Sequence, residues 1–260
     1  MLKLRATLAI AGIAAVAIAP SLARADNPAV TTLVYNFSYS ANQSVSARDS
    51  ANPVQDYGAP AGDAGAYPMN NQSSGISHYA GTLTDKGTMT VQIIGKPQAD
   101  GGQVVTISEA GENIRRAPAA TCVVYGNTRA VCDPNKTVYT EEYTLLRFLG
   151  AKFVDPNALD KNKHWQVSQD SPVDNVTADY SINANNNGAM QISEVRKIRQ
   201  AKGGSLTTDV QAKIGYDVAK SVPTTVDEYV TQRHDNGVEG TSTTIYQTTL
   251  QLVSDTMAKI

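Results

Sequence analysis

The sequence predicts a mainly β protein in which a long antiparallel meander forms a curved sheet or half-barrel, with one short helix near residues 140–150. Three observations predict this fold class. Apolar and polar residues alternate with a period of two along several segments, as in strands with one buried face. Turn-forming residues such as glycine, asparagine and aspartate separate these segments. Helical periodicity, by contrast, is scarce and is clearest just after Thr140.

The first predicted strand has one aromatic and aliphatic face, made by Leu33, Tyr35, Phe37 and Tyr39. Residues 48–75 are rich in glycine, proline and asparagine and have no periodic apolar face, so we expect a long mobile loop there. Two strands, 77–84 and 88–94, are then predicted on either side of a turn at Asp85-Lys86-Gly87. Another strand is expected over 104–108.

Cys122 and Cys132 flank a predicted hairpin with a turn at Gly126-Asn127. A two-residue loop would place Cys122 opposite Val131. A three-residue loop pairs Tyr125 with Arg129 and places the two cysteines directly opposite each other. We therefore predict the three-residue register and a cross-strand disulfide. The spacing is far from Cys-x-x-Cys, which disfavours a redox or metal pair.

A helix is predicted from Thr140, a candidate N-cap, to Leu149. Glu141 and Glu142 lie in its first turn, where carboxylates interact favourably with the helix dipole. Gly150 is in a position typical of a helix stop. A second short helical turn is expected within 156–160.

The strongest alternation lies in residues 206–218, where Leu206, Val210, Ile214 and Tyr216 share one face. Residues 244–252 repeat the pattern near the C-terminus, with Tyr246 and Leu250 on the apolar face. These segments predict long antiparallel strands. Their shared apolar face has to be covered by barrel closure, by a second sheet, or by curling of the sheet around the helix.

Residues 1–25 have the features of a secretory signal peptide. Lys3 and Arg5 precede an apolar run over 6–19, and Ala23-Arg24-Ala25 matches a cleavage site. The run is shorter than the ~20 residues that span a bilayer. Cleavage after Ala25 removes three basic side chains, which changes the net charge from -2 to -5. The remaining 26–260 are expected to form a single β-rich domain in the periplasm or outside the cell, with no membrane span.

Few residues suggest catalysis or a cofactor. The three histidines, His78, His164 and His234, lack metal-ligand spacing, and no Gly-x-Ser-x-Gly or phosphate-binding glycine motif occurs. We therefore predict no catalytic residue, metal or cofactor. The negative net charge also argues against binding to nucleic acid. Asp227 and Glu228 are adjacent, so in a strand they would point to opposite faces.

The signal peptide, the helix-bearing segment and the C-terminal meander of long amphipathic strands together resemble bacterial periplasmic lipoprotein-carrier-like half-barrel proteins and related uncharacterised secreted families. The resemblance covers roughly residues 140–255 and is one of pattern, without a diagnostic motif. It implies a concave apolar face that holds a lipid. No functional residue of the family is transferred to this sequence.

Three functional hypotheses follow. The first is a secreted or periplasmic binding protein that holds a lipid or another apolar small molecule on the concave face of the sheet. Its predicted ligand-binding residues are Phe148, Leu149, Leu206, Val210, Ile214, Tyr216, Tyr246 and Leu250. The second is a structural or adhesion-type β-sandwich that acts through its surface. The third is a hydrolase whose catalytic residues converge only in the folded chain. The sequence does not indicate the oligomeric state.

Overall fold

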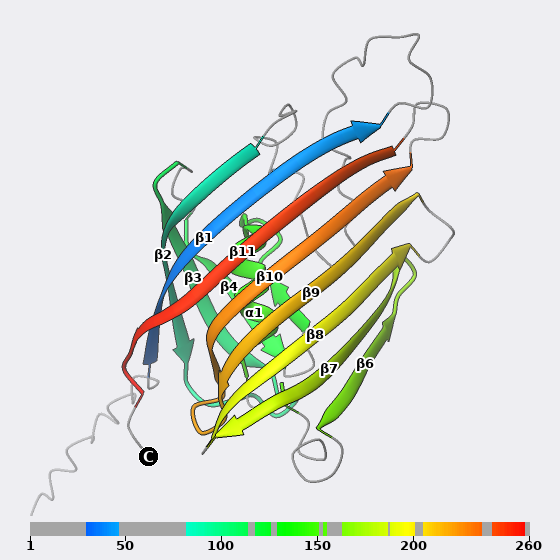
Figure 1. Ribbon diagram of the computed structural model, residues 1–260. Helices are drawn as coiled ribbons and strands as arrows, with labels where there is room; N and C mark the ends of the chain where they lie inside the picture. The colour runs from blue at the N-terminus through cyan, green and yellow to red at the C-terminus, as the bar shows by residue number, and fades with distance from the viewer. Residues whose placement is uncertain are drawn as a thin grey trace, which may run out of the picture.

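A computed structural model of the chain describes residues 30–46, 82–113, 118–125, 129–150, 153–154, 163–186, 188–200, 205–235 and 241–257. These residues form eleven strands and one helix (Figure 1). The elements are β1 (Val30–Ser46), β2 (Thr82–Ile94), β3 (Gln103–Gly111), β4 (Ala120–Tyr125), β5 (Arg129–Cys132), α1 (Thr140–Arg147), β6 (His164–Asp170), β7 (Asp174–Asn186), β8 (Ala189–Gln200), β9 (Leu206–Asp217), β10 (Val222–Asp235) and β11 (Thr241–Asp255). The predicted signal peptide 1–25, the predicted loop 48–75, the predicted turn 156–160 and His78 lie outside the described residues.

All eleven strands belong to one antiparallel, open, curved sheet, as the sequence predicts. Their order is β5-β4-β3-β2-β1-β11-β10-β9-β8-β7-β6. The sheet consists of two meanders, β1 to β5 and β6 to β11, joined where the first and last strands pair from Leu33↔Asp255 to Ser46↔Thr241. The pairing of β1 with β11 thus holds the two ends of the described chain side by side.

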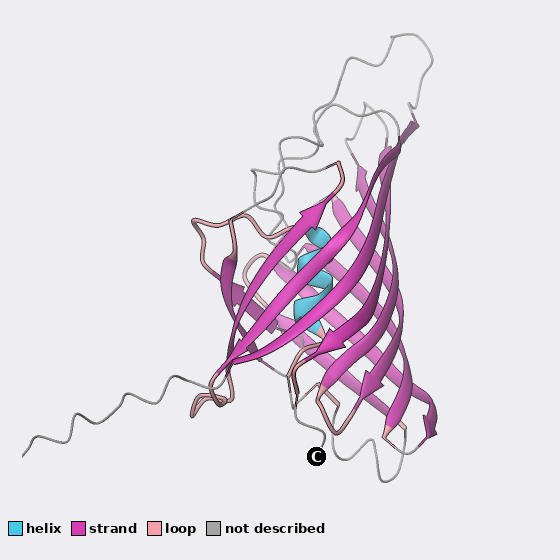
Figure 2. Cartoon of the chain, turned by 90° about the vertical axis from the view of Figure 1, so that its left-hand side faces the viewer, coloured by secondary structure: helices cyan, strands magenta, loops and turns pink. Residues whose placement is uncertain are grey.

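The sheet curves around α1, which lies on its concave side (Figure 2). The helix starts where expected, but its N-cap is Tyr139 rather than Thr140, and the backbone N–H of Tyr139 donates to the Glu142 carboxylate. Its C-cap is Phe148, and Gly150 has a φ of 110° two residues later. Of the three ways to cover the apolar face, curling around the helix is therefore the one observed.

Burial alternates along the strands in the predicted phase. On β1, the buried residues include Leu33, Tyr35, Phe37 and Tyr39. On β9, Thr208, Val210, Ala212, Ile214 and Tyr216 are buried, and their cross-strand partners on β8 and β10 are buried as well. The period-two pattern thus identifies the concave face correctly.

The predicted turn at Asp85–Gly87 is wrong, because β2 continues through these residues. The seventeen-residue β1 pairs with β2 across them, from Ser38↔Lys86 to Phe37↔Gly87. Asp85 is buried, and its Oδ1 accepts the backbone N–H of Asn113 at 2.9 Å. Gly87 is required by close packing, since a Cβ at this position would lie 2.1 Å from the Ala110 carbonyl oxygen.

The cysteine hairpin has the predicted register. Tyr125 pairs with Arg129 and Cys122 with Cys132, and the two sulfurs form a disulfide. This disulfide fixes β5, the strand at one edge of the sheet, to β4.

Candidate functional site

A row of mostly polar side chains crosses the concave face. The strand register places one buried residue on each of eight neighbouring strands in line. We call this line the polar row: Trp165, Tyr180, Glu194, Ala212, Glu228, Thr248, Tyr39 and Asp85. Three carboxylates, two phenols and a threonine hydroxyl thus share one line inside the sheet.

The next line of inward-facing residues, two positions along each strand, is apolar. We call it the apolar row: Ile182, Ile192, Ile214, Val226, Leu250 and Phe37. A sharp boundary between polar and apolar surface therefore crosses the concave face nearly at right angles to the strands.

Helix α1 packs with polar side chains against the polar row. Thr144 Oγ1 donates to Glu228 Oε1 at 2.6 Å, and Arg147 Nη2 donates to Glu228 Oε2. Arg147 Nη1 also donates to Glu194 Oε1 at 2.9 Å and to Oε2 at 3.1 Å. The side chains of Arg147, Glu194 and Glu228 are fully buried. Residues on one side of the helix thus bind carboxylates from β8 and β10.

Glu194 is the centre of this network. Besides Arg147, its Oε1 accepts the Tyr180 hydroxyl at 2.7 Å and Arg196 Nε at 3.0 Å. Burial alone would raise the pKa of Glu194, but the charges of Arg147 and Arg196 and these hydrogen bonds lower it below its usual value. Two arginines and two glutamates therefore form a neutral, buried group with its charges paired.

A second group of carboxyls lies at the other end of the helix. We call it the acidic cluster: Asp85 on β2, Glu109 on β3, and Glu141 and Glu142 on α1, all buried. Burial, the neighbouring carboxyls and a side-chain hydrogen bond with Glu141 raise the pKa of Glu109 to about 10. Burial also raises the pKa of Glu141 to about 7, although the hydrogen bond with Glu109 acts in the opposite direction. Burial likewise raises the pKa of Glu142 to about 7. The neighbours that raise the pKa of Glu109 are other carboxyls, whereas arginines lower the pKa of Glu194. The cluster therefore differs from the paired network around Glu194.

The predicted ligand-binding residues do not form one continuous surface in the structure. Ile214 and Leu250 lie in the apolar row, whereas Val210 and Tyr246 lie on the far side of the polar row. Tyr216 lies beyond the apolar row, and its hydroxyl donates to the Gly150 carbonyl at 3.1 Å. Leu206, at the start of β9, is only half-buried.

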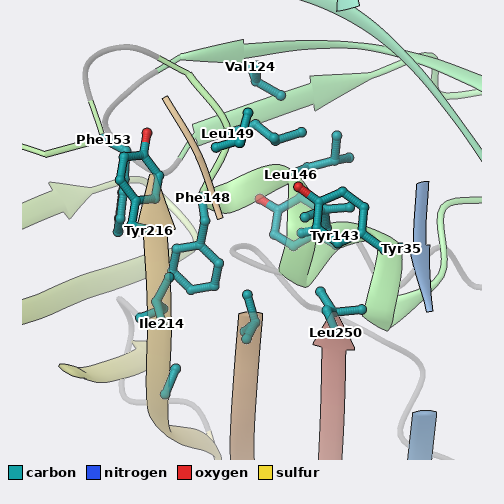
Figure 3. Close-up of a cluster of buried hydrophobic side chains, with 14 of the residues drawn as sticks. Tyr35, Val124, Tyr143, Leu146, Phe148, Leu149, Phe153, Ile214, Tyr216 and Leu250 are labelled. Atoms are coloured by element: carbon teal, nitrogen blue, oxygen red, sulfur yellow. The ribbon is translucent and has the colours of Figure 1, made fainter. Parts of the chain in front are cut away.

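Phe148 and Leu149, the predicted contribution of the helical segment, are buried and lie among other buried side chains at the end of α1 (Figure 3). Phe153 extends this packing, with ring centroids 5.3 Å from Phe148, 5.1 Å from Tyr216 and 5.9 Å from Trp165. The protein's own side chains, from residues just after the helix, therefore fill part of the concave face. Trp165, the single tryptophan, belongs to this aromatic packing.

The charged members of the site were missed by the sequence analysis, although the sequence holds a signal for them. Glu194 and Arg196 interrupt the apolar face of a strand between Ile192 and Ile198, and Glu228 stands between Val226 and Val230. A charge in phase with buried neighbours must be paired or neutral. The prediction that Asp227 and Glu228 point to opposite faces is confirmed, with Glu228 buried and Asp227 exposed.

Within the described ranges, no set of three or more histidine, cysteine, aspartate or glutamate side chains is arranged to hold a metal ion. The same ranges contain no helix with the length and apolar character needed to cross a membrane.

No protein-family model and no curated protein matches the sequence. Among solved structures, the chain is similar to a lipovitellin structure described as showing lipid-protein interactions in lipovitellin. The TM-score is 0.49 and the sequence identity 8%, over 88% of this chain and 26% of the lipovitellin chain. This chain thus spans about a quarter of the length of that neighbour.

Proposed function

We propose that this is a secreted or periplasmic protein that binds an amphipathic, lipid-like ligand on the concave face of its sheet. The observation that carries the proposal is the boundary between the apolar row and the polar row. A ligand with an apolar tail and a polar head has the same division. The six side chains of the apolar row cross neighbouring strands and extend over about 24 Å, which suits an extended acyl chain.

Ligand entry in this proposal involves α1 and the residues that follow it. Phe148 and Leu149 are buried at the end of α1, on the concave side of the sheet. An acyl tail would replace their apolar contacts with contacts of the same kind, so little hydrophobic free energy is lost in the exchange. Burial of a tail is worth about 25 cal/mol per Å² before ordering costs are subtracted.

The dense packing of α1 and Phe153 favours a second candidate function, a β domain with a solid core that acts through its outer surface. Every residue of α1 from Glu141 to Arg147 is buried. The two candidates differ in one respect that is measurable: a carrier holds a ligand inside the sheet, and a solid domain does not.

Native mass spectrometry of the protein, purified gently from its own compartment, tests the proposal. A stoichiometric excess of lipid-sized mass that organic extraction removes is the expected result. A matched pair of variants locates the ligand: Val226→Thr adds a hydroxyl to the apolar row, and Val195→Thr makes the same change on the outer face, where Val195 is 48% exposed. Val226→Thr should lower the occupancy and Val195→Thr should not. A bare mass for the wild-type chain would favour the solid β domain.

A further inference from the structure

Strand β5 forms one open edge of the sheet, with β4 as its single neighbour among the described strands (Figure 1). The backbone N–H of Asp133 donates to the Thr121 carbonyl at 3.0 Å, which fixes the phase of the ladder between the two strands. Alternate residues of an antiparallel strand direct their N–H and C=O groups to opposite sides. The backbone of Val131 therefore bonds to β4, whereas the backbone groups of Ala130 and Cys132 face away from the sheet.

A second row of apolar side chains, on the outer, convex face of the sheet, runs straight to this edge. We call it the outer apolar row, with one residue on each strand from β1 to β5: Val30, Ile94, Val104, Val123 and Val131. Adjacent residues such as Val105 and Val124 point the other way and are buried, whereas Val30 and Val131 are 50% and 46% exposed. The row crosses four strand spacings, about 19 Å. The apolar surface thus ends abruptly at the open edge.

The opposite edge of the sheet is protected against pairing with another strand, as open edges usually are. β6 has a histidine and an aspartate at its two ends, and His164 lies 3.7 Å from Asp179 on β7. In β5, by contrast, Ala130, Val131 and Cys132 carry no charge. The β5 edge therefore offers outward-facing backbone groups beside an apolar surface.

We propose that β5 is a self-association surface, which pairs antiparallel with β5 of a second copy of the protein about a two-fold axis at Val131. In this register Ala130 exchanges both backbone hydrogen bonds with Cys132 of the second copy, and the symmetry repeats the exchange. Val131 lies opposite Val131 of the second copy, as a non-hydrogen-bonded pair whose side chains are close. The outer apolar row then continues across both copies for about 43 Å.

The neighbouring residues select this register over the alternatives. A register centred on Cys132 would place Ala130 opposite Pro134, which has no N–H to donate. A register centred on Ala130 would place Val131 opposite Arg129 and so interrupt the outer apolar row with a charge. The register centred on Val131 avoids both conflicts.

The charges that flank the uncharged stretch are complementary in the same register. Arg129 of each copy lies opposite Asp133 of the other, so the two-fold axis creates two such pairs. Arg129 is exposed, and its guanidinium lies 5.2 Å from the centroid of the Tyr125 ring. Asp133 is half-buried, and its Oδ1 accepts the backbone N–H of Asn135. Opposite charges on facing strands favour pairing. Backbone groups, apolar surface and charges are thus all matched by the same strand of a second copy.

The paired segment is short, so we expect a weak and reversible dimer. The interface lies at the edge and on the outer face of the sheet, away from the concave face. The inference therefore goes beyond the proposed function and does not depend on a ligand.

Sedimentation velocity of the protein from about 10 µM to about 1 mM tests the inference, because weak interfaces associate in this range. We expect the wild-type chain to dimerise as its concentration rises. Val131→Lys places two like charges opposite each other and should weaken dimerisation about tenfold. Val195→Lys makes the same change at a side chain of similar exposure on β8 and should leave dimerisation unchanged.

A mixture of Val131→Lys and Val131→Glu tests the register itself. Each variant alone should dimerise poorly, and the mixture should form a heterodimer, since opposite charges then meet at the axis. Ala130→Pro removes an outward-facing N–H and leaves the ladder with β4 intact, so it should also weaken dimerisation. Circular dichroism of each variant separates lost pairing from lost folding.

Three outcomes would overturn the proposal. A wild-type chain that stays monomeric at about 1 mM has no self-association surface, and its β5 edge is then left for a strand of another protein. A dimer that Val131→Lys does not weaken has its interface elsewhere. A mixture of the two charged variants that does not associate contradicts the two-fold axis at Val131.

Discussion

Removal of Arg147 should destabilise the protein far more than removal of an exposed arginine. Its guanidinium is fully buried between Glu194 and Glu228. Breaking a buried ion pair typically costs about 3–5 kcal/mol, because a charge is left in the protein interior without a partner. We therefore expect Arg147→Met to lower the free energy of unfolding by about 4 kcal/mol. Arg199→Met, at an ion pair with both side chains more than 40% exposed, should cost less than about 1 kcal/mol.

The two glutamates should respond differently once Arg147 is gone. Glu194 keeps Arg196 and the Tyr180 hydroxyl, whereas Glu228 keeps the Thr144 hydroxyl. Glu228→Gln in the Arg147→Met background should therefore recover much of the lost stability, and Glu194→Gln should recover less.

Urea unfolding followed by far-UV circular dichroism and by Trp165 fluorescence measures these differences. The reasoning is refuted if Arg147→Met costs no more than Arg199→Met. It is also refuted if Glu194→Gln rescues the variant better than Glu228→Gln.

Three further predictions concern other parts of the fold. Reduction of the Cys122–Cys132 disulfide should cost roughly 3 kcal/mol by the chain-entropy argument, measured as a lower urea midpoint with reductant. Phe153→Ala should cost about 3–5 kcal/mol and shift the emission of Trp165, whose ring it contacts; an unchanged spectrum would contradict this. Because burial raises the pKa of Glu142 from 4.5 to about 7, the folded chain retains a proton that the unfolded chain releases. Stability should thus fall as the pH rises from about 4.5 to about 7. Glu142→Gln should make this fall smaller, while the raised pKa values of Glu109 and Glu141 continue to contribute.

The sequence predicted the individual strands well because alternation is a local property. The burial phase of β1, β9 and β11 follows directly from residues two apart in the chain. The cysteine register was predictable for the same reason, since the hairpin loop is short. The failure at Asp85–Gly87 came from short-range turn chemistry, which was outweighed by pairing with the distant strand β1.

The candidate site was predicted only in part. Seven of the eight predicted ligand-binding residues are buried, on strands or at the end of α1: Phe148, Leu149, Val210, Ile214, Tyr216, Tyr246 and Leu250. Their division by the polar row was not predicted. Glu194 and Glu228 lie on otherwise apolar strand faces, which indicates that each needs a buried partner. Alternation alone does not identify those partners.

The sequence by itself determined the fold class, the face that each long strand buries and the pairing of the two cysteines. Only the tertiary structure decided how the strands align. β1 and β11 lie about two hundred residues apart in the chain yet pair side by side, and this pairing brings Tyr39 next to Thr248. The curvature of the sheet then brings the start of α1 to Asp85 and Glu109, and its end to Glu194. Local periodicity sets which way a side chain points, but register and curvature depend on contacts distant in sequence, and these contacts create the boundary on which the proposed function rests.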